Sequence, residues 1–107
     1  MTLRNEKLEE LIRKLAALFI QVESNGTSLI TVTRCSISPD SKRAMILVTV
    51  LPDTEEEKVI QFLKRKRSDF RDYVRSHARV RAIPLVDFEI DIGEKTRQKI
   101  DEIPRNS

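Results

Sequence analysis

The segment 44–51 has apolar side chains on both faces of a predicted strand, and this pattern constrains the fold more than any other in the chain. Alternation places Ala44, Ile46, Val48 and Val50 on one face, and Met45, Leu47, Thr49 and Leu51 on the other. Such a strand is either central in a sheet and covered on both sides, or it offers an apolar surface to a partner. Turn residues at 38–41 separate it from a second β-prone segment, 29–37, so we expect an antiparallel hairpin.

Helices are predicted on both sides of this hairpin. Before it, apolar residues recur at three- and four-residue steps and indicate an amphipathic helix over about residues 4–23. After it, Thr54 and Glu57 have the spacing of a capping box, in which the Thr hydroxyl and the Glu carboxylate each bind a free backbone N–H. We therefore expect another helix to begin near Glu55.

The last third of the chain predicts one more strand and one more helix. Residues 85–90 alternate with a single core face, and the polar segment 94–103 forms a short helix anchored mainly by Ile100 and Ile103. The expected order is α-β-β-α-α-β-α, and the length suits one domain over residues 1–107.

The helix that begins near Glu55 has a gap in its apolar stripe. The stripe contains Val59, Ile60 and Leu63 and resumes in the same angular phase at Phe70, Tyr73, Val74, His77 and Ala78. A continuous helix would place Lys66 on the buried side, and lysine is seldom fully buried unless it is paired. We therefore predict a bend or break there, with Ser68 capping a second helix.

Most of the positive charge lies in and after this gap. Between Lys64 and Arg81 there are eight basic residues and two acids, a local charge of +6 in eighteen residues against +3 for the whole chain. On a continuous helix, an arc of roughly 120° would hold five of them, Lys64, Arg67, Arg71, Arg75 and Arg79. Few acids have the helical spacing to pair with them, so the stripe indicates a polyanion-binding face rather than a merely solvated one.

Short motifs in a fixed order narrow the assignment further. They are Val32-x-x-Cys35-x-Ile37-Ser38-x-Asp40, Ala44-x-Ile46-x-Val48-Thr49-Val50, Phe70-Arg71, Arg79-Val80-Arg81-x-x-Pro84, Phe88, Asp91 and Ile100-Asp101-Glu102-Ile103. In this order they resemble the ribosome-binding factor A family over about residues 4–103. The resemblance implies an α+β fold of the type II KH-like class, with helices packed on a three-stranded sheet. Members carry a small-x-Gly interruption between the paired helices, where this chain has Lys66-Arg67-Ser68; Lys and Ser do not allow the close backbone approach of Ala and Gly.

The same resemblance implies a non-catalytic, cytoplasmic maturation factor. It would bind the small ribosomal subunit through its ribosomal RNA, near the decoding region. No apolar run approaches the ~20 residues of a membrane span, so we expect no membrane association; we also expect a monomer with no cofactor. The predicted RNA-binding residues are Lys64, Arg65, Lys66, Arg67, Ser68, Arg71, Arg75, Arg79 and Arg81. Arg and Lys neutralise phosphates without reading sequence, so recognition is expected to rest on backbone and shape.

Two alternatives stay open. Arg34, Lys42 and Arg43 lie in or beside the hairpin and are either further phosphate contacts or ordinary solvated charges. The competing function is a protein-interaction adaptor on the same scaffold, in which the apolar second face of the hairpin, with Met45, Leu47 and Leu51, binds the partner and the basic stripe only steers it.

Catalytic and metal chemistry find little support in the sequence. His77 lies on an apolar stripe, where a packed or half-buried histidine is expected, and Cys35 occupies a core-facing strand position. One His and one Cys cannot form a structural zinc site, and no glycine-rich phosphate-binding motif is present. Asp87, Glu89 and Asp91 share one face of the third strand and are interpreted as an exposed strand face rather than a cation site.

Overall fold

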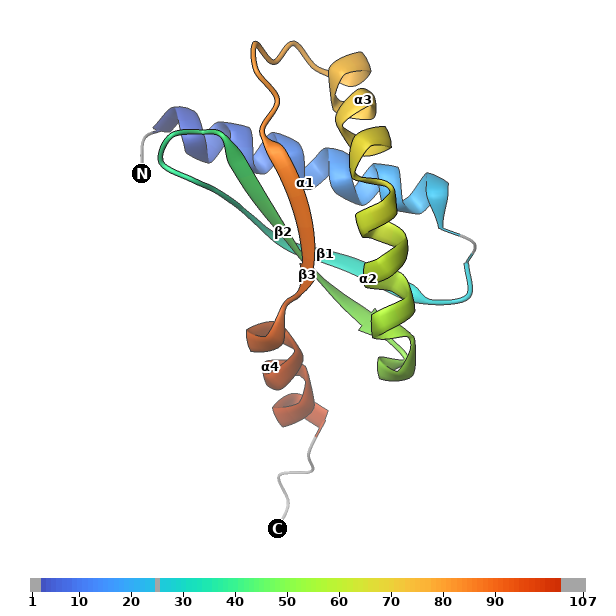
Figure 1. The fold of residues 1–107 in the computed structure, drawn as a ribbon. Helices are drawn as coiled ribbons and strands as arrows, with labels where there is room; N and C mark the ends of the chain where they lie inside the picture. The colour runs from blue at the N-terminus through green and yellow to red at the C-terminus, as the bar shows by residue number, and fades with distance from the viewer. Residues whose placement is uncertain (1–2, 25, 103–107) are drawn as a thin grey trace.

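The computed structural model describes residues 3–24 and 26–102, and its elements follow the predicted order (Figure 1). They are α1 (Leu3–Glu23), β1 (Leu29–Ile37), β2 (Arg43–Leu51), the 3₁₀ turn η1 (Asp53–Glu55), α2 (Glu56–Arg65), α3 (Arg67–His77), β3 (Leu85–Ile90) and α4 (Ile92–Glu102). The predicted α+β arrangement of helices on a three-stranded sheet is confirmed.

The sheet has the order β1-β2-β3, so the strand with two apolar faces is the central one. β1 and β2 pair antiparallel as the predicted hairpin, whereas β2 and β3 pair parallel. A parallel neighbour needs a crossover connection, which α2 and α3 provide. A β-bulge at Thr33 shifts the register between Val32 and Arg34, and it brings both Val32 and Cys35 to the core face.

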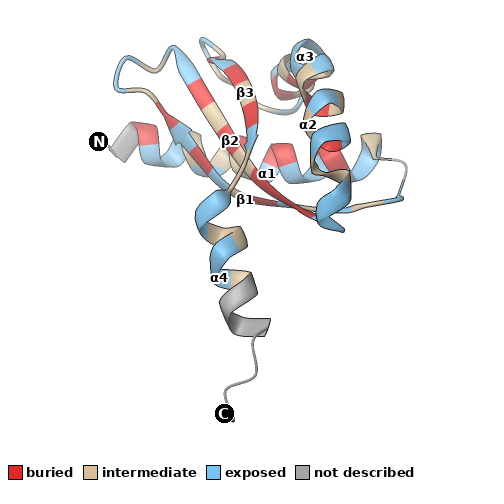
Figure 2. Cartoon of the chain, turned by 60° about the horizontal axis from the view of Figure 1, so that its bottom comes forward, coloured by how far each residue is buried: buried red, intermediate tan, exposed pale blue. Residues whose placement is uncertain are grey.

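The core lies between one face of the sheet and the helices α1, α2 and α3, all of which contact strands (Figure 2). Phe70 of α3 is fully buried at its centre, with ring centroids 5.3 Å from Phe19 of α1 and 6.0 Å from Phe88 of β3. Edge-to-face and tilted contacts of this kind join the three elements. Despite this apolar packing, none of the described helices is both long and apolar enough to cross a bilayer.

α4 extends away from the other helices and is fixed at its first turn (Figure 1). The Asp91 carboxylate accepts the Glu94 N–H at 3.0 Å and the Thr33 hydroxyl at 2.5 Å, so it caps α4 and ties it to the bulge of β1. These two bonds hold the pKa of the Asp91 carboxyl below its usual range. Asp91 is therefore a helix cap and not part of an exposed strand face. The side chains of the predicted anchors Ile100 and Ile103 lie outside the described residues.

The predicted capping box at the start of α2 is wrong. Thr54 lies inside η1, where the Glu55 N–H binds the Pro52 carbonyl at 3.0 Å, and the residue before α2 is Glu55, which makes no side-chain cap bond. Because the chain already turns helically at η1, Thr54 does not have the extended backbone that an N-cap needs. Lys95 of α4 instead pairs with Glu56, at 3.0 Å.

Candidate nucleic-acid interface

The paired helices break at Lys66, as the gap in the apolar stripe predicted. Its backbone has φ −96° and ψ 7°, and its N–H is shared between the carbonyls of Phe62 at 3.2 Å and Leu63 at 3.0 Å. The Phe70 N–H then binds the Lys66 carbonyl at 2.8 Å, which starts α3. The break keeps Lys66 out of the core: its side chain is 33% exposed, with Nζ 3.6 Å from the Asp69 carboxylate and 5.8 Å from the centre of the Phe62 ring.

The predicted cap at Ser68 is wrong. Ser68 is the second residue of α3 and is exposed, and the position before the helix belongs to Lys66, which makes no side-chain cap bond. Since the Lys66 carbonyl already accepts the first helical bond, Ser68 lies inside the helix and not at the position from which a side chain caps it. Asp69 in the first turn of α3 supplies the negative charge that a helix start favours.

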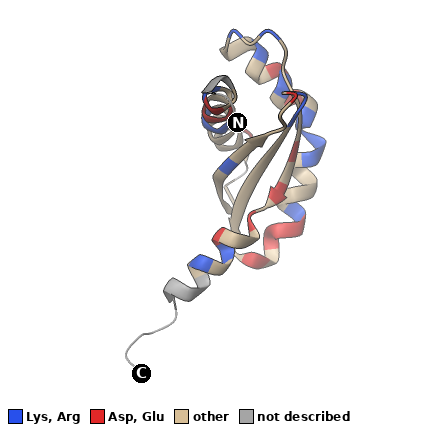
Figure 3. Cartoon of the chain, turned by 90° about the vertical axis from the view of Figure 1, so that its left-hand side faces the viewer, with Lys and Arg blue, Asp and Glu red and all other residues tan. Residues whose placement is uncertain are grey.

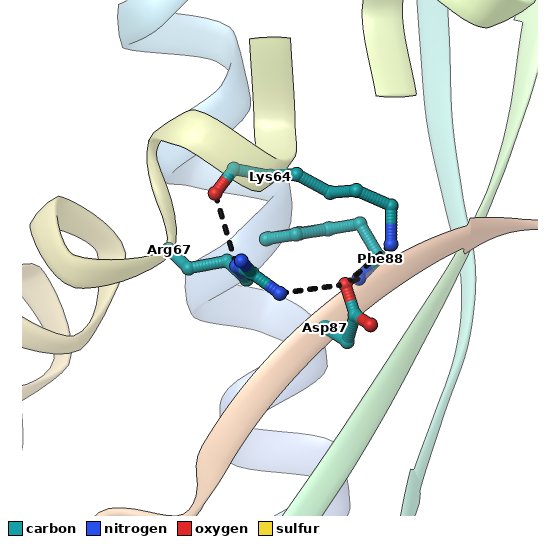
Figure 4. Close-up of polar contacts among 4 residues, drawn as sticks. All are labelled: Lys64, Arg67, Asp87 and Phe88. Atoms are coloured by element: carbon teal, nitrogen blue, oxygen red, sulfur yellow. Dashed lines mark hydrogen bonds and ion pairs between the residues drawn. The ribbon is translucent and has the colours of Figure 1, made fainter. Parts of the chain in front are cut away.

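Two cations on opposite sides of the break share one carboxylate (Figure 4). Lys64 Nζ lies 2.8 Å and Arg67 Nη1 3.4 Å from the same Asp87 oxygen, and Arg67 Nε also donates to the Lys64 carbonyl at 3.0 Å. Partial burial raises the pKa of the Asp87 carboxyl, but the bonds from Lys64 and from the Phe88 N–H, with the charges of both cations, outweigh it and lower that pKa. Asp87 is thus ionised at neutral pH and is not the free strand-face acid expected from the sequence.

The two arginines of α3 have different roles. Arg71 is half-buried, and its guanidinium donates to the carbonyls of Pro84 at 3.2 Å and Ile83 at 3.1 Å, so it anchors the loop that leads into β3. Arg75 is exposed and pairs with Asp72 at 2.7 Å. Arg71 therefore keeps its full charge while doing structural work, whereas the charge of Arg75 is offset by a neighbour.

Arg65, Arg79 and Arg81 are exposed and have no ion pair among the residues that the structure describes. Arg79 lies beyond α3, which ends at His77 and continues in the extended conformation of Ala78. The predicted 120° arc on a single helix therefore does not exist, because the helix breaks at Lys66 and stops before Arg79.

The basic residues still gather around the junction and the loop after α3 (Figure 3). As expected, few acids pair with them at helical spacing: among the described residues only Asp69 and Asp72 do so. The fold adds one carboxylate from β3, Asp87, so that four of the eight have a carboxylate within 4.0 Å. These four are Lys64, Lys66, Arg67 and Arg75. With the three carboxylates involved, Asp69, Asp72 and Asp87, the eight cations leave a net charge of +5. Acidic residues collect instead at the opposite end of α2, in its first turn.

A family model for ribosome-binding factor A matches residues 4–104. The chain belongs to this family. The ribosome-binding factor A of Thermosipho africanus is 28% identical over 106 residues, which cover 94% of this chain and 84% of that protein. The one from Fervidobacterium nodosum is 32% identical over 77 residues, which cover 71% of this chain but only 62% of that relative.

Solved structures share the fold of this ribosome-binding factor A family member. The crystal structure of ribosome-binding factor A from Thermus thermophilus has a TM-score of 0.72 at 22% identity, over 80% of this chain and 94% of that one, and shows likeness of fold alone. The solution structure of a Thermotoga maritima protein assigned to ribosome-binding factor A has a TM-score of 0.69 at 25% identity, over 81% and 86% of the two chains.

The hairpin of this family member brings further charge near the break. Arg43 and Arg67 line one groove together with Met45, Leu85 and Asp87. Lys42 is exposed at the hairpin turn, and Arg34 is exposed on β1, which is an edge strand. Sequence reasoning did not place Asp87 at this site, because only the fold brings β3 beside the helix break.

His77 and Cys35, the two residues weighed for catalysis, lie in different elements, at the end of α3 and within β1. His77 is exposed rather than half-buried, because it ends α3 beyond the core, but its ring packs on Tyr73 with centroids 3.9 Å apart. Cys35 is buried as predicted, and burial, followed by the charge of Glu9, raises the pKa of its thiol to about 12. A thiol that stays protonated is a poor nucleophile. Among the described residues, no cluster of His, Cys, Asp and Glu has the size to hold a metal ion.

Proposed function

We propose that this protein is a maturation factor of the small ribosomal subunit and binds the ribosomal RNA of that subunit through the basic junction of α2 and α3. Membership of the ribosome-binding factor A family supports a ribosomal partner. The observation that carries the RNA contact is the net charge of +5 around the helix break and the following loop. The proposed contact residues are Lys64, Arg65, Lys66, Arg67, Ser68, Arg71, Arg75, Arg79 and Arg81.

These residues would contribute unequally. Arg65, Arg79 and Arg81 can reach a phosphate without breaking an ion pair among the described residues, so they are the primary contacts. Arg71 contributes its charge from a fixed position, because its donors already bind the Ile83 and Pro84 carbonyls. The remaining cations must exchange a carboxylate for a phosphate.

Recognition would rest on the RNA backbone and on shape rather than on base stacking. Three of the four phenylalanines, Phe19, Phe70 and Phe88, are buried, and Phe62 packs at the core edge beneath Lys66. Tyr73 packs edge-on against Phe19 and is covered by His77. Proteins that bind single-stranded bases usually present exposed aromatic side chains, and the described surface offers none that is free.

The test compares two triple variants of equal charge. The interface variant replaces the three unpaired cations, as R65Q, R79Q and R81Q, and the control variant replaces three exposed cations of α1 and α4, as K7Q, K14Q and R97Q. Binding to a small-subunit RNA fragment is followed by fluorescence anisotropy from 50 to 300 mM salt, and binding to purified small subunits by co-sedimentation.

Each lost phosphate contact reduces the slope of log affinity against log salt by ~0.7–0.9. We expect the slope of log affinity against log salt to become shallower by about 2 to 3 for the interface variant. This variant should also no longer co-sediment with small subunits, while the control variant keeps the wild-type slope. Equal behaviour of the two variants would mean that only net charge matters and that this surface is not the interface.

The adaptor function receives less support. Leu51 and Leu85 are 47% and 61% exposed, but they lie at opposite ends of the sheet: Leu51 pairs with Leu29, and Leu85 with Arg43. Met45 and Leu47 between them are half-buried. Protein-binding surfaces are usually contiguous apolar patches, which this stretched arrangement does not form.

A further inference from the structure

One oxygen of Asp87 collects three hydrogen-bond donors from three parts of the fold. They are Lys64 Nζ at the end of α2, at 2.8 Å, Arg67 Nη1 at the start of α3, at 3.4 Å, and the backbone N–H of Phe88 in β3, at 2.8 Å (Figure 4). Two positive side chains and an amide around one anionic oxygen form the kind of arrangement that binds a phosphate oxygen. Here a carboxylate of the protein itself occupies it.

The occupied position lies inside the proposed RNA interface. Lys64 and Arg67 flank the break, and Arg67 and Asp87 line the groove that also holds Arg43. A phosphate that approaches these two cations also meets the negative charge of Asp87, because that carboxylate is ionised, only partly buried and in contact with both of them. Lys64 and Arg67 together then present one net positive charge instead of two.

We propose that Asp87 is an internal competitor for RNA phosphate, which occupies Lys64 and Arg67 in the free protein and lowers its affinity for polyanions. This inference rests on the proposed function, since it assigns a role to one residue of the same interface. RNA binding exchanges the carboxylate for a phosphate at the two cations, while Asp87 keeps its bond to the Phe88 N–H.

The size of the effect follows from counterion release. Removing the Asp87 charge frees one further cation for a phosphate, so the slope of log affinity against log salt should steepen by ~0.7 for single-stranded RNA. At 0.1 M salt that slope difference corresponds to an affinity gain of about fivefold.

Asp87→Asn is the test variant, and Glu89→Gln is its matched control. Glu89 is exposed on the same face of β3, two residues along, and makes no ion pair among the described residues. Both substitutions remove one acid and keep the shape of the side chain. The probe is a polyuridine oligonucleotide, titrated by anisotropy between 20 and 200 mM salt. We expect the gain for Asp87→Asn only, because Glu89 pairs with neither Lys64 nor Arg67 and its removal frees no cation.

A background variant keeps the test independent of folding. In a K64Q, R67Q protein the competitor has no cations to occupy, so adding Asp87→Asn there should give the same small change as Glu89→Gln. Thermal melts of all variants set the assay temperature below every transition. A gain of about fivefold that persists in the K64Q, R67Q background would overturn the mechanism, because it would come from general repulsion.

Two further outcomes separate this inference from the proposed function. In the first, wild-type protein binds RNA with a salt-dependent affinity, but Asp87→Asn either weakens binding or behaves like Glu89→Gln. Asp87 then holds the cations in place or has no role in binding, which refutes the competitor role and leaves the proposed function standing. If neither the wild type nor Asp87→Asn binds polyuridine or small subunits, the proposed function fails as well.

Discussion

Arg71 should be needed for stability more than for RNA affinity, and Arg71→Ala tests this. Its guanidinium lies across the loop between α3 and β3 and donates to two carbonyls, those of Ile83 and Pro84. Pro84 is fully buried, so the loop is fixed directly before β3 begins at Leu85. Truncation leaves these partly buried carbonyls without their charged donor.

The expected cost is set by those two bonds. A hydrogen bond to a charged group contributes about 1.5–3 kcal/mol net. Because Arg71 is only half-buried and water can replace part of each bond, we expect a loss of about 2 kcal/mol in total. For a domain of this size each kcal/mol lowers the melting temperature by about 4–8 °C, so the melting temperature should fall by about 8–16 °C.

Arg75→Ala is the matched control, one helical turn away. Arg75 makes an exposed ion pair with Asp72, and such pairs contribute about 0.2–1 kcal/mol. Both proteins are followed by far-ultraviolet circular dichroism in heat and in urea, and their RNA slopes are measured below both transitions. Arg71→Lys should keep the RNA slope but not the melting temperature, since Lys lacks the planar fork. Melting of Arg71→Ala within 2 °C of Arg75→Ala would refute the anchor.

Three smaller predictions use the same assays. The buried Cys35 thiol should resist alkylation at pH 8 until the protein unfolds. Between about pH 9 and 12 the folded state keeps a proton on this thiol that the unfolded state loses, so the free energy of unfolding should fall as pH rises. This part of the fall should be absent in Cys35→Ala. Asp91→Ala should cost about 0.5–2 kcal/mol in urea unfolding, since it removes the cap at Glu94; an unchanged midpoint would contradict the cap. Ser68→Ala should change the unfolding free energy by less than about 0.5 kcal/mol, and a cost above about 1 kcal/mol would restore Ser68 as a cap.

The sequence predicted the strands and the break well because burial alone determines both. The bounds of β1 and β3 agree with the predicted segments 29–37 and 85–90. The first was predicted from its β-prone residues and the turn after it, and the second from its two-residue alternation, and both signals are readable without tertiary information. The break followed from the cost of burying Lys66 between Leu63 and Phe70, both of which are fully buried. The bulge at Thr33 left no comparable signal, because the mixed polar and apolar residues of β1 do not fix one phase of alternation.

Capping and charge pairing were predicted poorly, because both depend on tertiary packing that the sequence pattern does not show. A cap contributes only about 0.5–2 kcal/mol, so packing decides where a helix begins and the nearest suitable Ser or Thr is not always used. The partners of Lys64 and Arg71 are more than ten positions away, a carboxylate on β3 and two loop carbonyls. Helical spacing tests only neighbours three or four residues apart, and therefore counted these cations as unpaired.

The break forms here without the glycine of the family motif, and the backbone explains how. Lys66 turns the chain with a negative φ, which any residue can adopt, and Ser68 at the glycine position is helical. The C-terminal end of α2 is satisfied locally: the Lys66 N–H is shared by two carbonyls of α2, and Arg67 Nε donates to the Lys64 carbonyl. Lys64 and Arg65 also place positive charge at the C-terminal end of α2, where the helix dipole favours it. Lys66 and Ser68 do not allow RNA to approach the backbone as closely as Ala and Gly would. The proposed phosphate contacts at this junction therefore depend on long basic side chains, two of which, Lys64 and Arg67, must first separate from Asp87.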